Sequence, residues 1–196
     1  MKYTRLDWLK KNEQAAIEES IAMMSYNPSI GRALKSGGVT EFQKIAIKKI
    51  KALKNITSQI EFDRFHERFV KAVMSKIKKT SKGNKISYGH GQKAVNVFLK
   101  VYIDWASYPN KHVADRLRSF LHVPLDSWVM WYIKNGRFND FSRIVKPVYK
   151  KQGKISYNFP LYDIDKNIYC AWQELCRMIC PNKPVLLDVI WARAPR

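Results

Sequence analysis

The chain has 196 residues, 46% of them hydrophobic, which is enough to bury the core of one domain without disulfides or a structural metal. Its 36 Lys and Arg against 16 Asp and Glu leave a net charge of +20, which attracts polyanions, nucleic acid first and anionic membranes second. No uncharged run is as long as the roughly 18 residues that a transmembrane helix needs. We therefore expect a single domain over residues 1–196 and no membrane partner.

The positive charge is distributed along the chain rather than held in a tail. It amounts to +6, +7, +6 and +1 over residues 1–59, 60–100, 101–160 and 161–196. This predicts a folded basic surface rather than a disordered arm. The cysteines, Cys170, Cys176 and Cys180, are odd in number, and the N-terminus has no apolar signal segment. Both features predict a cytoplasmic protein whose thiols are reduced and pack in the core.

Two helices are expected in the first part of the chain. Thr4-Arg5-Leu6-Asp7 has the pattern of an N-terminal cap and predicts a helix to about Met24. Apolar residues at helical spacing predict a second helix from Thr40 to Asn55. The outer side of this second helix carries lysines: Lys44, Lys48, Lys49, Lys51 and Lys54.

The strongest helical periodicity runs from Ile60 to Lys79. Its apolar face consists of Phe62, Phe65, Phe69, Val73 and Ile77. The opposite face is basic and consists of Arg64, Arg68, Lys71, Lys78 and Lys79. Such a stripe is usually only solvated, but this one continues into a basic loop over residues 76–85. The continuity favours a surface that follows the phosphates of a nucleic acid.

A helix from Gln92 to Trp105 is expected at the centre of the fold. Its apolar residues fill so wide an arc that more than one neighbouring helix has to cover it. A narrower polar stripe contains Gln92, Lys93, Asn96, Lys100 and Asp104. This stripe is either a solvated edge, a buried hydrogen-bond network, or the floor of a site to which Tyr88 and His90 also contribute.

The second half of the chain continues the helical pattern. A helix of about three turns is predicted around Val113 and Leu117, and Leu125 to Lys134 is apolar nearly all round, which predicts a second buried helix. A short helix is expected over Asp140 to Val145. A last helix starts at Asp163 or Asp165 and ends at Cys180, with Trp172, Leu175, Met178 and Ile179 in the core. The tail is expected to pack through Leu186, Leu187, Ile190 and Trp191.

Residues 146–160 interleave basic and aromatic side chains, with lysines that include Lys150, Lys151 and Lys154. Such a segment can bind phosphates and stack on bases. It can equally be a solubilising loop held in place by its aromatic residues. The sequence leaves both interpretations open.

The sequence contains no pattern for a cofactor or a metal. The metal-ligand spacings of His and Cys, the phosphate-binding glycine loops and the acidic clusters that hold Mg²⁺ are all missing. We therefore expect no metal and no cofactor. A metal-free reaction on RNA would need a histidine as general acid or base and a cation beside the developing phosphorane.

Two residues fit that requirement. Arg116 and His122 are separated by five residues and resemble the Arg-x(4–6)-His motif of the HEPN superfamily, helical domains that include metal-free ribonucleases and toxins. The resemblance implies that Arg116 and His122 would be catalytic. Leu117 stands where that family usually has a polar residue. The alternative is that His122 caps a turn while Arg116 is solvated.

A longer resemblance covers about the last 120 residues. Its residues occur in order as Tyr88-Gly89-His90-Gly91-Gln92-Lys93 with Asn96 and Leu99-Lys100, His122-x-Pro124-Leu125-Asp126, Tyr169-x-x-Trp172-Gln173 with Arg177, and Asp188 with Trp191. Together they resemble a group of uncharacterised small helical proteins of bacteria and phages. The resemblance implies a compact prokaryotic or viral domain and assigns no activity.

The sequence thus predicts an all-α domain of about six to eight helices around the helix from Gln92 to Trp105. The expected function is non-specific or shape-selective nucleic-acid binding. The expected phosphate contacts are Arg64, Arg68, Lys71, Lys78, Lys79, Lys82, Lys85, Lys93, Lys100, Lys150, Lys151 and Lys154. The alternatives are a metal-independent ribonuclease or toxin, and a phage-encoded inhibitor that docks on an acidic protein.

Overall fold

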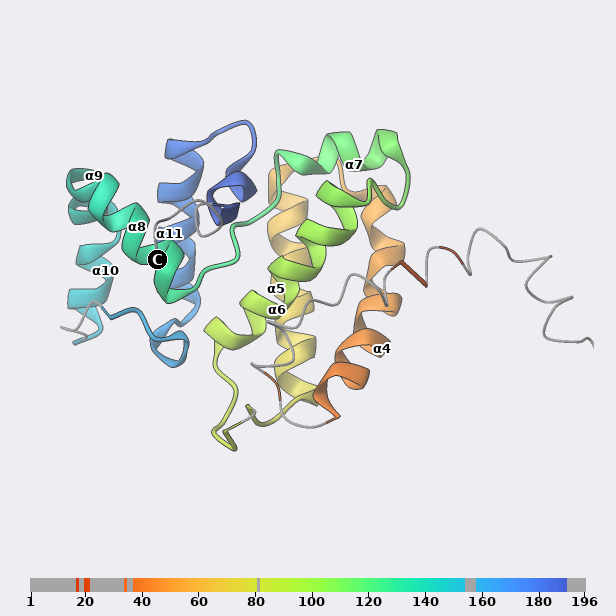
Figure 1. Ribbon diagram of the computed structural model, residues 1–196, viewed down its shortest axis with the longest axis horizontal. Coiled ribbons are helices and arrows are strands. Elements are labelled where there is room, and N and C mark those ends of the chain that lie inside the picture. The colour runs from red at the N-terminus through yellow and green to blue at the C-terminus, as the bar shows by residue number, and fades with distance from the viewer. Residues whose placement is uncertain are drawn as a thin grey trace, which may run out of the picture.

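The computed structural model describes residues 17, 20, 21, 34, 37–80, 82–153 and 158–189, and the regular elements in these ranges are helices (Figure 1). The predicted all-α class is confirmed. The α-helices are α4 (Gly38–Ile50), α5 (Gln59–Lys76), α6 (Tyr88–Leu99), α7 (Lys111–Arg118), α8 (Ser127–Gly136), α9 (Phe138–Ile144), α10 (Lys146–Lys151) and α11 (Lys166–Ile179). Tighter or wider turns form η1 (Lys51–Asn55), η2 (Lys100–Trp105), η3 (Leu161–Asp163) and η4 (Pro184–Val189).

Several expectations fall on other parts of the chain. The helix expected to end at Met24 lies outside the described residues except at positions 17, 20 and 21, and Lys154, Ile190 and Trp191 lie outside them as well. In the part of the chain that the structure describes, no helix is long and apolar enough to cross a membrane.

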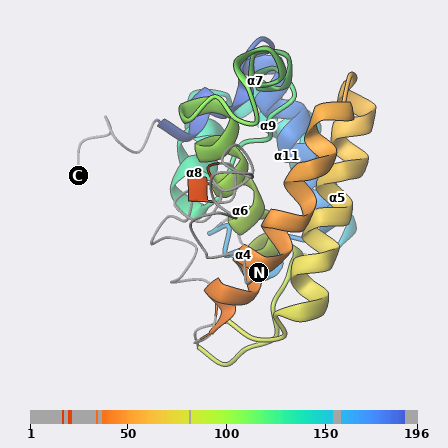
Figure 2. The same ribbon diagram turned by 90° about the vertical axis from the view of Figure 1, so that its right-hand side faces the viewer.

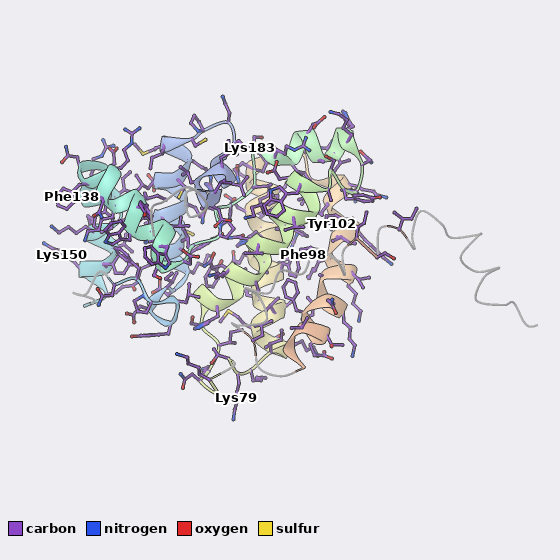
Figure 3. The ribbon with its side chains drawn as sticks, viewed as in Figure 1. Lys79, Phe98, Tyr102, Phe138, Lys150 and Lys183 are labelled. Carbon is purple, nitrogen blue, oxygen red and sulfur yellow. The ribbon has the colours of Figure 1, made fainter. Side chains whose placement is uncertain are left out.

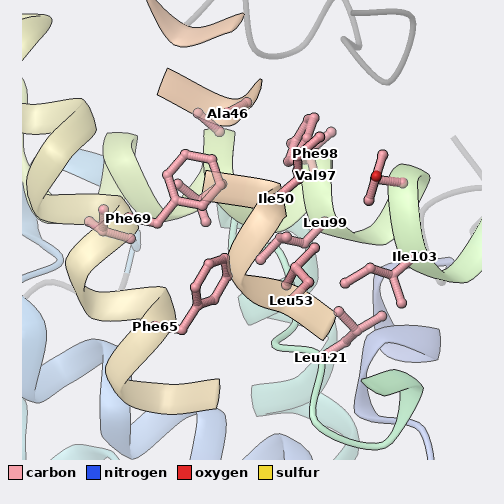
Figure 4. Packing of buried hydrophobic residues seen from close by; sticks show 14 of the residues in the cluster. Ala46, Ile50, Leu53, Phe65, Phe69, Val97, Phe98, Leu99, Ile103 and Leu121 are labelled. Carbon is pink, nitrogen blue, oxygen red and sulfur yellow. The ribbon is translucent and has the colours of Figure 1, made fainter. Parts of the chain in front are cut away.

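The helices pack around two hydrophobic cores. The first core is enclosed by α4, α5, α6 and α7, on the right of Figure 1, and the second by α8, α9, α10 and α11, on the left. In the first core, the Phe69 ring stacks on Phe42 and meets Phe98 edge to face. Figure 4 shows Phe69 and Phe98 among the buried side chains of this core. Figure 3 shows Phe98 and Tyr102 inside this half, with Lys79 and Lys150 at the periphery. The half-buried Tyr88 packs against both cores.

Side-chain caps explain where several helices begin. Ser58 caps α5 and Ser87 caps α6, each in a capping box with the residue three positions on, Glu61 or His90. Asn110, Asp126 and Asp165 accept from the backbone N–H three residues later and so begin α7, α8 and α11.

The first turn of α6 packs directly on η3. The Gly89 N–H donates to the Ile164 carbonyl over 3.0 Å, and a Cβ at Gly89 would lie only 2.1 Å from the Leu161 carbonyl oxygen. The close approach therefore requires a residue without a side chain. The helix was predicted to begin at Gln92, but α6 begins four residues earlier, at Tyr88, and includes both glycines.

The central helix changes its geometry after Leu99. Residues Lys100–Trp105 form a π-helical turn, whose i→i+5 bonds rotate the following side chains away from the positions of a regular α-helix. For this reason Trp105, which was predicted to face the core, is 57% exposed. The buried residues of α6 include Gln92 and Asn96, as expected for the hydrogen-bond-network interpretation of the polar stripe.

Other core predictions need correction in the second half. Helix α8 buries Val129, Met130 and Ile133, but Trp128 and Trp131 are exposed, because only one face of this helix contacts the second core. Three further side chains expected in the core or against it also lie at the surface: Cys170, Met178 and Leu186.

The packing gives a direct test of the first core. We expect Phe69→Ala to lower the free energy of unfolding by about 3–5 kcal/mol, because the fully buried ring leaves a cavity between α4 and α6. Ile60→Ala, in the same helix but 63% exposed, should change it by less than about 0.5 kcal/mol. Urea denaturation measures both. Equal effects of the two substitutions would show that the core is misplaced.

Candidate functional site

The chain leaves α5 in a short ordered hairpin, called here the lysine hairpin (residues 78–80 and 82–85). Ile86 N–H donates to the Lys78 carbonyl over 3.1 Å, and Thr80 N–H donates to the Asn84 carbonyl over 2.8 Å. Buried Ile77 and Ile86 attach both ends of the hairpin to the first core. The exposed side chains are Lys78, Lys79, Lys82 and Lys85. The hairpin therefore presents four cations on a backbone that is already ordered.

The outer face of α5 continues this basic surface. Arg64, Arg68 and Lys71 are exposed, and Lys71 forms an ion pair with Glu67 at 2.8 Å. Glu67 also binds Lys166 of α11 at 2.9 Å. No ion pair of Arg64, Arg68 or the hairpin lysines occurs within the described ranges.

The sequence around the lysine hairpin contains no acidic residue. From Arg68 to Ile103 there is no Asp or Glu, although nine Lys and Arg fall in this stretch. The hairpin projects at one end of the first half, opposite α7, and both views show this separation (Figures 1 and 2). The positive charge of the hairpin is thus not neutralised by its neighbours along the chain.

The other cations expected to bind phosphate lie elsewhere. Lys93 is mostly buried and binds Asp126 at 3.2 Å, while Lys100 is buried and paired with Asp188. Neither ammonium is available to a polyanion. Lys150 and Lys151 are exposed at the end of α10 in the second half, away from Lys79 (Figure 3).

A buried polar network lies between the two cores. It consists of His66 on α5, Gln92 and Asn96 on α6, His122 before α8, and Tyr169 and Gln173 on α11. Asn96 Nδ2 lies 3.0–3.1 Å from the oxygens of Gln92, Val123 and Tyr169. The Gln173 side chain donates to the Val123 carbonyl and accepts from the Val123 N–H, both over 2.9 Å. These bonds join α5, α6 and α11 to the segment that connects the two halves.

Backbone groups at the edge of the network determine its hydrogen positions. The Val123 carbonyl can only accept, so the Asn96 atom beside it is the amide nitrogen, and the amide oxygen faces His66. His66 Nε2 therefore carries a proton and donates it to Asn96 Oδ1 over 2.6 Å. The two nitrogens beside the Tyr169 hydroxyl, Asn96 Nδ2 and His66 Nε2, both carry hydrogens and so cannot accept the hydrogen of that hydroxyl.

The Tyr169 hydroxyl accordingly donates in the remaining direction, to His122 Nδ1 over 2.6 Å. His122 thus carries its own proton on Nε2 and donates it to Asp63 Oδ1 over 2.7 Å. Every proton in this chain of bonds has an acceptor when both histidines are neutral. An additional proton on His122 would be carried by Nδ1 and would point at the Tyr169 oxygen. The Tyr169 hydroxyl would then have no acceptor for its own hydrogen.

The electrostatic surroundings also favour neutral rings. Burial lowers the pKa of His66 well below its usual value, and the neighbouring His122 lowers it further. Burial likewise lowers the pKa of His122, although its hydrogen bond to Asp63 opposes the shift. Partial burial is the largest single effect on Asp63 and favours its neutral form, but the hydrogen bonds from His122 and Gln59 and the charge of Arg177 together outweigh it, so the pKa of Asp63 is lowered.

The network reaches the surface at Asp63 and Arg177. Arg177 Nη2 lies 3.4 Å from Asp63 Oδ1 and 3.0 Å from His122 Nε2. Arg116, the expected partner of His122, instead donates to the Lys54 carbonyl over 2.9 Å. The structure therefore places Arg177, and not Arg116, beside His122.

The clustering of Asp63, His66 and Arg177 was not predicted from the sequence. A signal for it exists in the last helix, where Tyr169, Gln173 and Arg177 recur every four residues and so share one face. A second signal is His66, the polar residue between Phe65 and Phe69 on the buried side of α5. The two expected site residues at the start of α6 have structural contacts: His90 caps the helix, and Tyr88 packs on Tyr169.

A buried ion pair holds the end of the described chain. Lys100 of η2 binds Asp188 of η4, and its ammonium also lies 4.6 Å from the centre of the Trp105 ring. Burial raises the pKa of Asp188, and the charge of Lys100 opposes that rise. The Lys100 charge thus fixes η4 against the central helix instead of serving a ligand.

Comparison of the chain with protein-family models, with curated proteins and with solved structures found no match. Within the described residues, no group of three or more His, Cys, Asp and Glu side chains is arranged to hold a metal ion. The basic surface and the polar network are therefore the candidate functional features of the described residues.

The neutral histidines predict a pH dependence of stability. Their pKa values are about 6.5 in the unfolded chain and lower in the folded one, so below about pH 6.5 the unfolded state binds more protons. The free energy of unfolding should therefore decrease as the pH is lowered from 7 to 5, by up to about 1.4 kcal/mol per pH unit for each histidine ring. Urea denaturation at several pH values measures the slope.

His66→Gln should reduce this slope, whatever it does to the absolute stability. Replacing the exposed His112 by Gln is the matched control and should leave the slope unchanged. A wild-type slope in the His66→Gln variant would show that His66 is not held neutral by burial.

The Lys100–Asp188 pair predicts a non-additive result. Lys100→Met leaves a carboxylate buried without a partner and should cost about 3–5 kcal/mol of stability. The double variant Lys100→Met/Asp188→Leu removes both charges and should recover most of this loss. Thermal or urea denaturation of the three proteins tests the coupling, and a double variant no more stable than Lys100→Met would refute it.

Proposed function

We propose that the protein binds nucleic acid through phosphate contacts made by the outer face of α5 and the lysine hairpin. The observation that carries this proposal is the acid-free stretch from Arg68 to Ile103 and the exposed cations it contributes. Arg64 extends the same surface by one helical turn. The contact residues are Arg64, Arg68, Lys78, Lys79, Lys82 and Lys85.

The ordered hairpin supports this function physically. Its backbone bonds and buried isoleucines hold the bases of the lysine side chains in place, so binding a polyanion orders only the ends of those side chains. Contacts of Lys and Arg with phosphates release counterions but do not read base identity. The proposed binding is accordingly non-specific or selective for the shape of the nucleic acid.

The arrangement gives less support to a metal-independent ribonuclease. Asp63 Oδ1 occupies the hydrogen-bonding direction of His122 Nε2, and Arg116 is bonded to the Lys54 carbonyl. A general base at His122 would first have to be released from Asp63. Incubation of RNA with the protein in EDTA, with His122→Ala as the comparison, measures any such cleavage.

The binding proposal is tested by charge reversal with a matched control. Lys82→Glu/Lys85→Glu should weaken binding to every sequence at least tenfold. Lys51→Glu/Lys111→Glu changes the net charge equally at the other end of the first half, where Arg116 of α7 contacts η1. The control should have a much smaller effect, because the surface and not the total charge is proposed to bind.

Fluorescence anisotropy with labelled 20-nucleotide and 20-base-pair ligands measures these affinities between 50 and 200 mM salt. If six phosphates are contacted, the slope of log K against log salt on duplex should be about −5, and the hairpin variant should reduce its magnitude by about 2. Absence of binding at 50 mM salt, or equal losses in the two double variants, would contradict the proposal. Retention of an acidic protein ligand in excess bulk DNA would point to the inhibitor alternative.

A further inference from the structure

Helix α8 presents an aromatic face that lies outside both hydrophobic cores of the described residues. Trp128, Trp131 and Tyr132 occupy positions i, i+3 and i+4 and so lie on one side of the helix. Trp128 is 62% exposed and Trp131 47% exposed. Their rings group around Tyr132, with ring centres 6.4 Å apart for Trp128 and 4.9 Å apart for Trp131. The other side of α8 already supplies the contacts with the second core.

Two exposed tryptophans on one helical face indicate a binding surface. Scattered exposed apolar residues are ordinary in proteins, but a contiguous aromatic group of this size is characteristic of interaction sites. The Trp131 and Tyr132 planes stand nearly perpendicular, at 88°, whereas Trp128 and Tyr132 are inclined by only 26°. A flat ligand could therefore stack on the Trp128 side, and a second could stack against Trp131.

Charge identifies the class of ligand. No Asp or Glu occurs from Ser127 to Asn139, whereas Lys134 and Arg137 do. A net charge of +20 opposes the approach of a second copy of the chain and attracts a polyanion. A flat apolar group attached to a polyanion describes the unpaired bases of a single-stranded nucleic acid, which stack on aromatic side chains.

The aromatic face is also connected to the proposed phosphate surface. The lysine hairpin leads into α6 at Ser87, and Lys93 in the second turn of α6 binds Asp126, the residue that caps α8. Trp128 follows this cap by two residues. The first two turns of α6 are thus the structural link between the hairpin and the aromatic face.

We propose that Trp128, Trp131 and Tyr132 stack on unpaired bases, so that the preferred ligand of the protein is single-stranded nucleic acid. This proposal rests on the nucleic-acid binding proposed above and adds the strandedness of the ligand. The cations hold the phosphates and the aromatic face holds the bases. In duplex DNA or RNA the bases are stacked inside the helix and unavailable to these rings.

The test compares a labelled 20-nucleotide single strand with a 20-base-pair duplex. Trp128→Ala/Trp131→Ala should weaken single-strand binding at least tenfold, since stacking contributes about 5- to 150-fold per base. The affinity of this double variant for duplex should differ from that of the wild type by less than twofold. Trp105→Ala is the control, because Trp105 is equally exposed but lies on η2 outside this face. Trp128→Leu keeps an apolar side chain and should still lose single-strand affinity.

The outcomes separate the two proposals. If the hairpin reversal weakens both ligands and the tryptophan variant weakens neither, the stacking proposal is overturned and phosphate binding stands. If no nucleic acid binds the wild type, both are overturned. If sedimentation shows a wild-type dimer that Trp128→Ala/Trp131→Ala converts to a monomer with unchanged single-strand affinity, the face joins two copies of the chain and stacking is likewise refuted. Near-identical melting curves confirm that the variants are folded.

Discussion

The arrangement of the two halves depends on the side-chain amide of Asn96. Its nitrogen lies beside oxygens of Gln92, Val123 and Tyr169, and its oxygen accepts from His66, so this residue of α6 joins its own helix to α5, α11 and the connecting segment. A buried amide left without partners costs about 1–3 kcal/mol, and each half alone would leave some of these groups unsatisfied. The network is therefore complete only when both cores are docked in one relative position.

This docking also determines where the surface charges lie. The lysine hairpin is attached to the first core through Ile77 and Ile86, whereas α8 belongs to the second core. Without a fixed contact between the halves, a chain of charge +20 would separate its basic surfaces by repulsion. The polar network and the Lys93–Asp126 pair oppose that separation and hold the hairpin and the aromatic face of α8 in one body.

Helical periodicity predicted the buried face where a helix is regular and well covered, but not which residues meet across helices. The apolar face of α5 was predicted from Phe62, Phe65 and Phe69 alone, because a helix of regular pitch repeats its faces along the sequence. The exposure of Trp105 was not, since the π-turn breaks that repeat. The contact of His122 with Arg177 was also missed, because partners 55 residues apart are brought together only by the packing of α11. The exposure of Trp128 and Trp131 was missed as well, because the sequence does not show that only one face of α8 contacts the second core.

The bonding of Val123 has an evolutionary consequence. Both its N–H and its carbonyl are paired with the side chain of Gln173, which takes the place that a neighbouring β-strand would occupy. A strand partner offers main-chain groups whatever its sequence, whereas this pairing exists only while a carboxamide stands at one position. Each apolar core can drift through many combinations of hydrophobic residues. The polar contact between the two halves tolerates far fewer substitutions. Selection to keep the halves docked should therefore act most strictly on the side-chain amides of Gln92, Asn96 and Gln173.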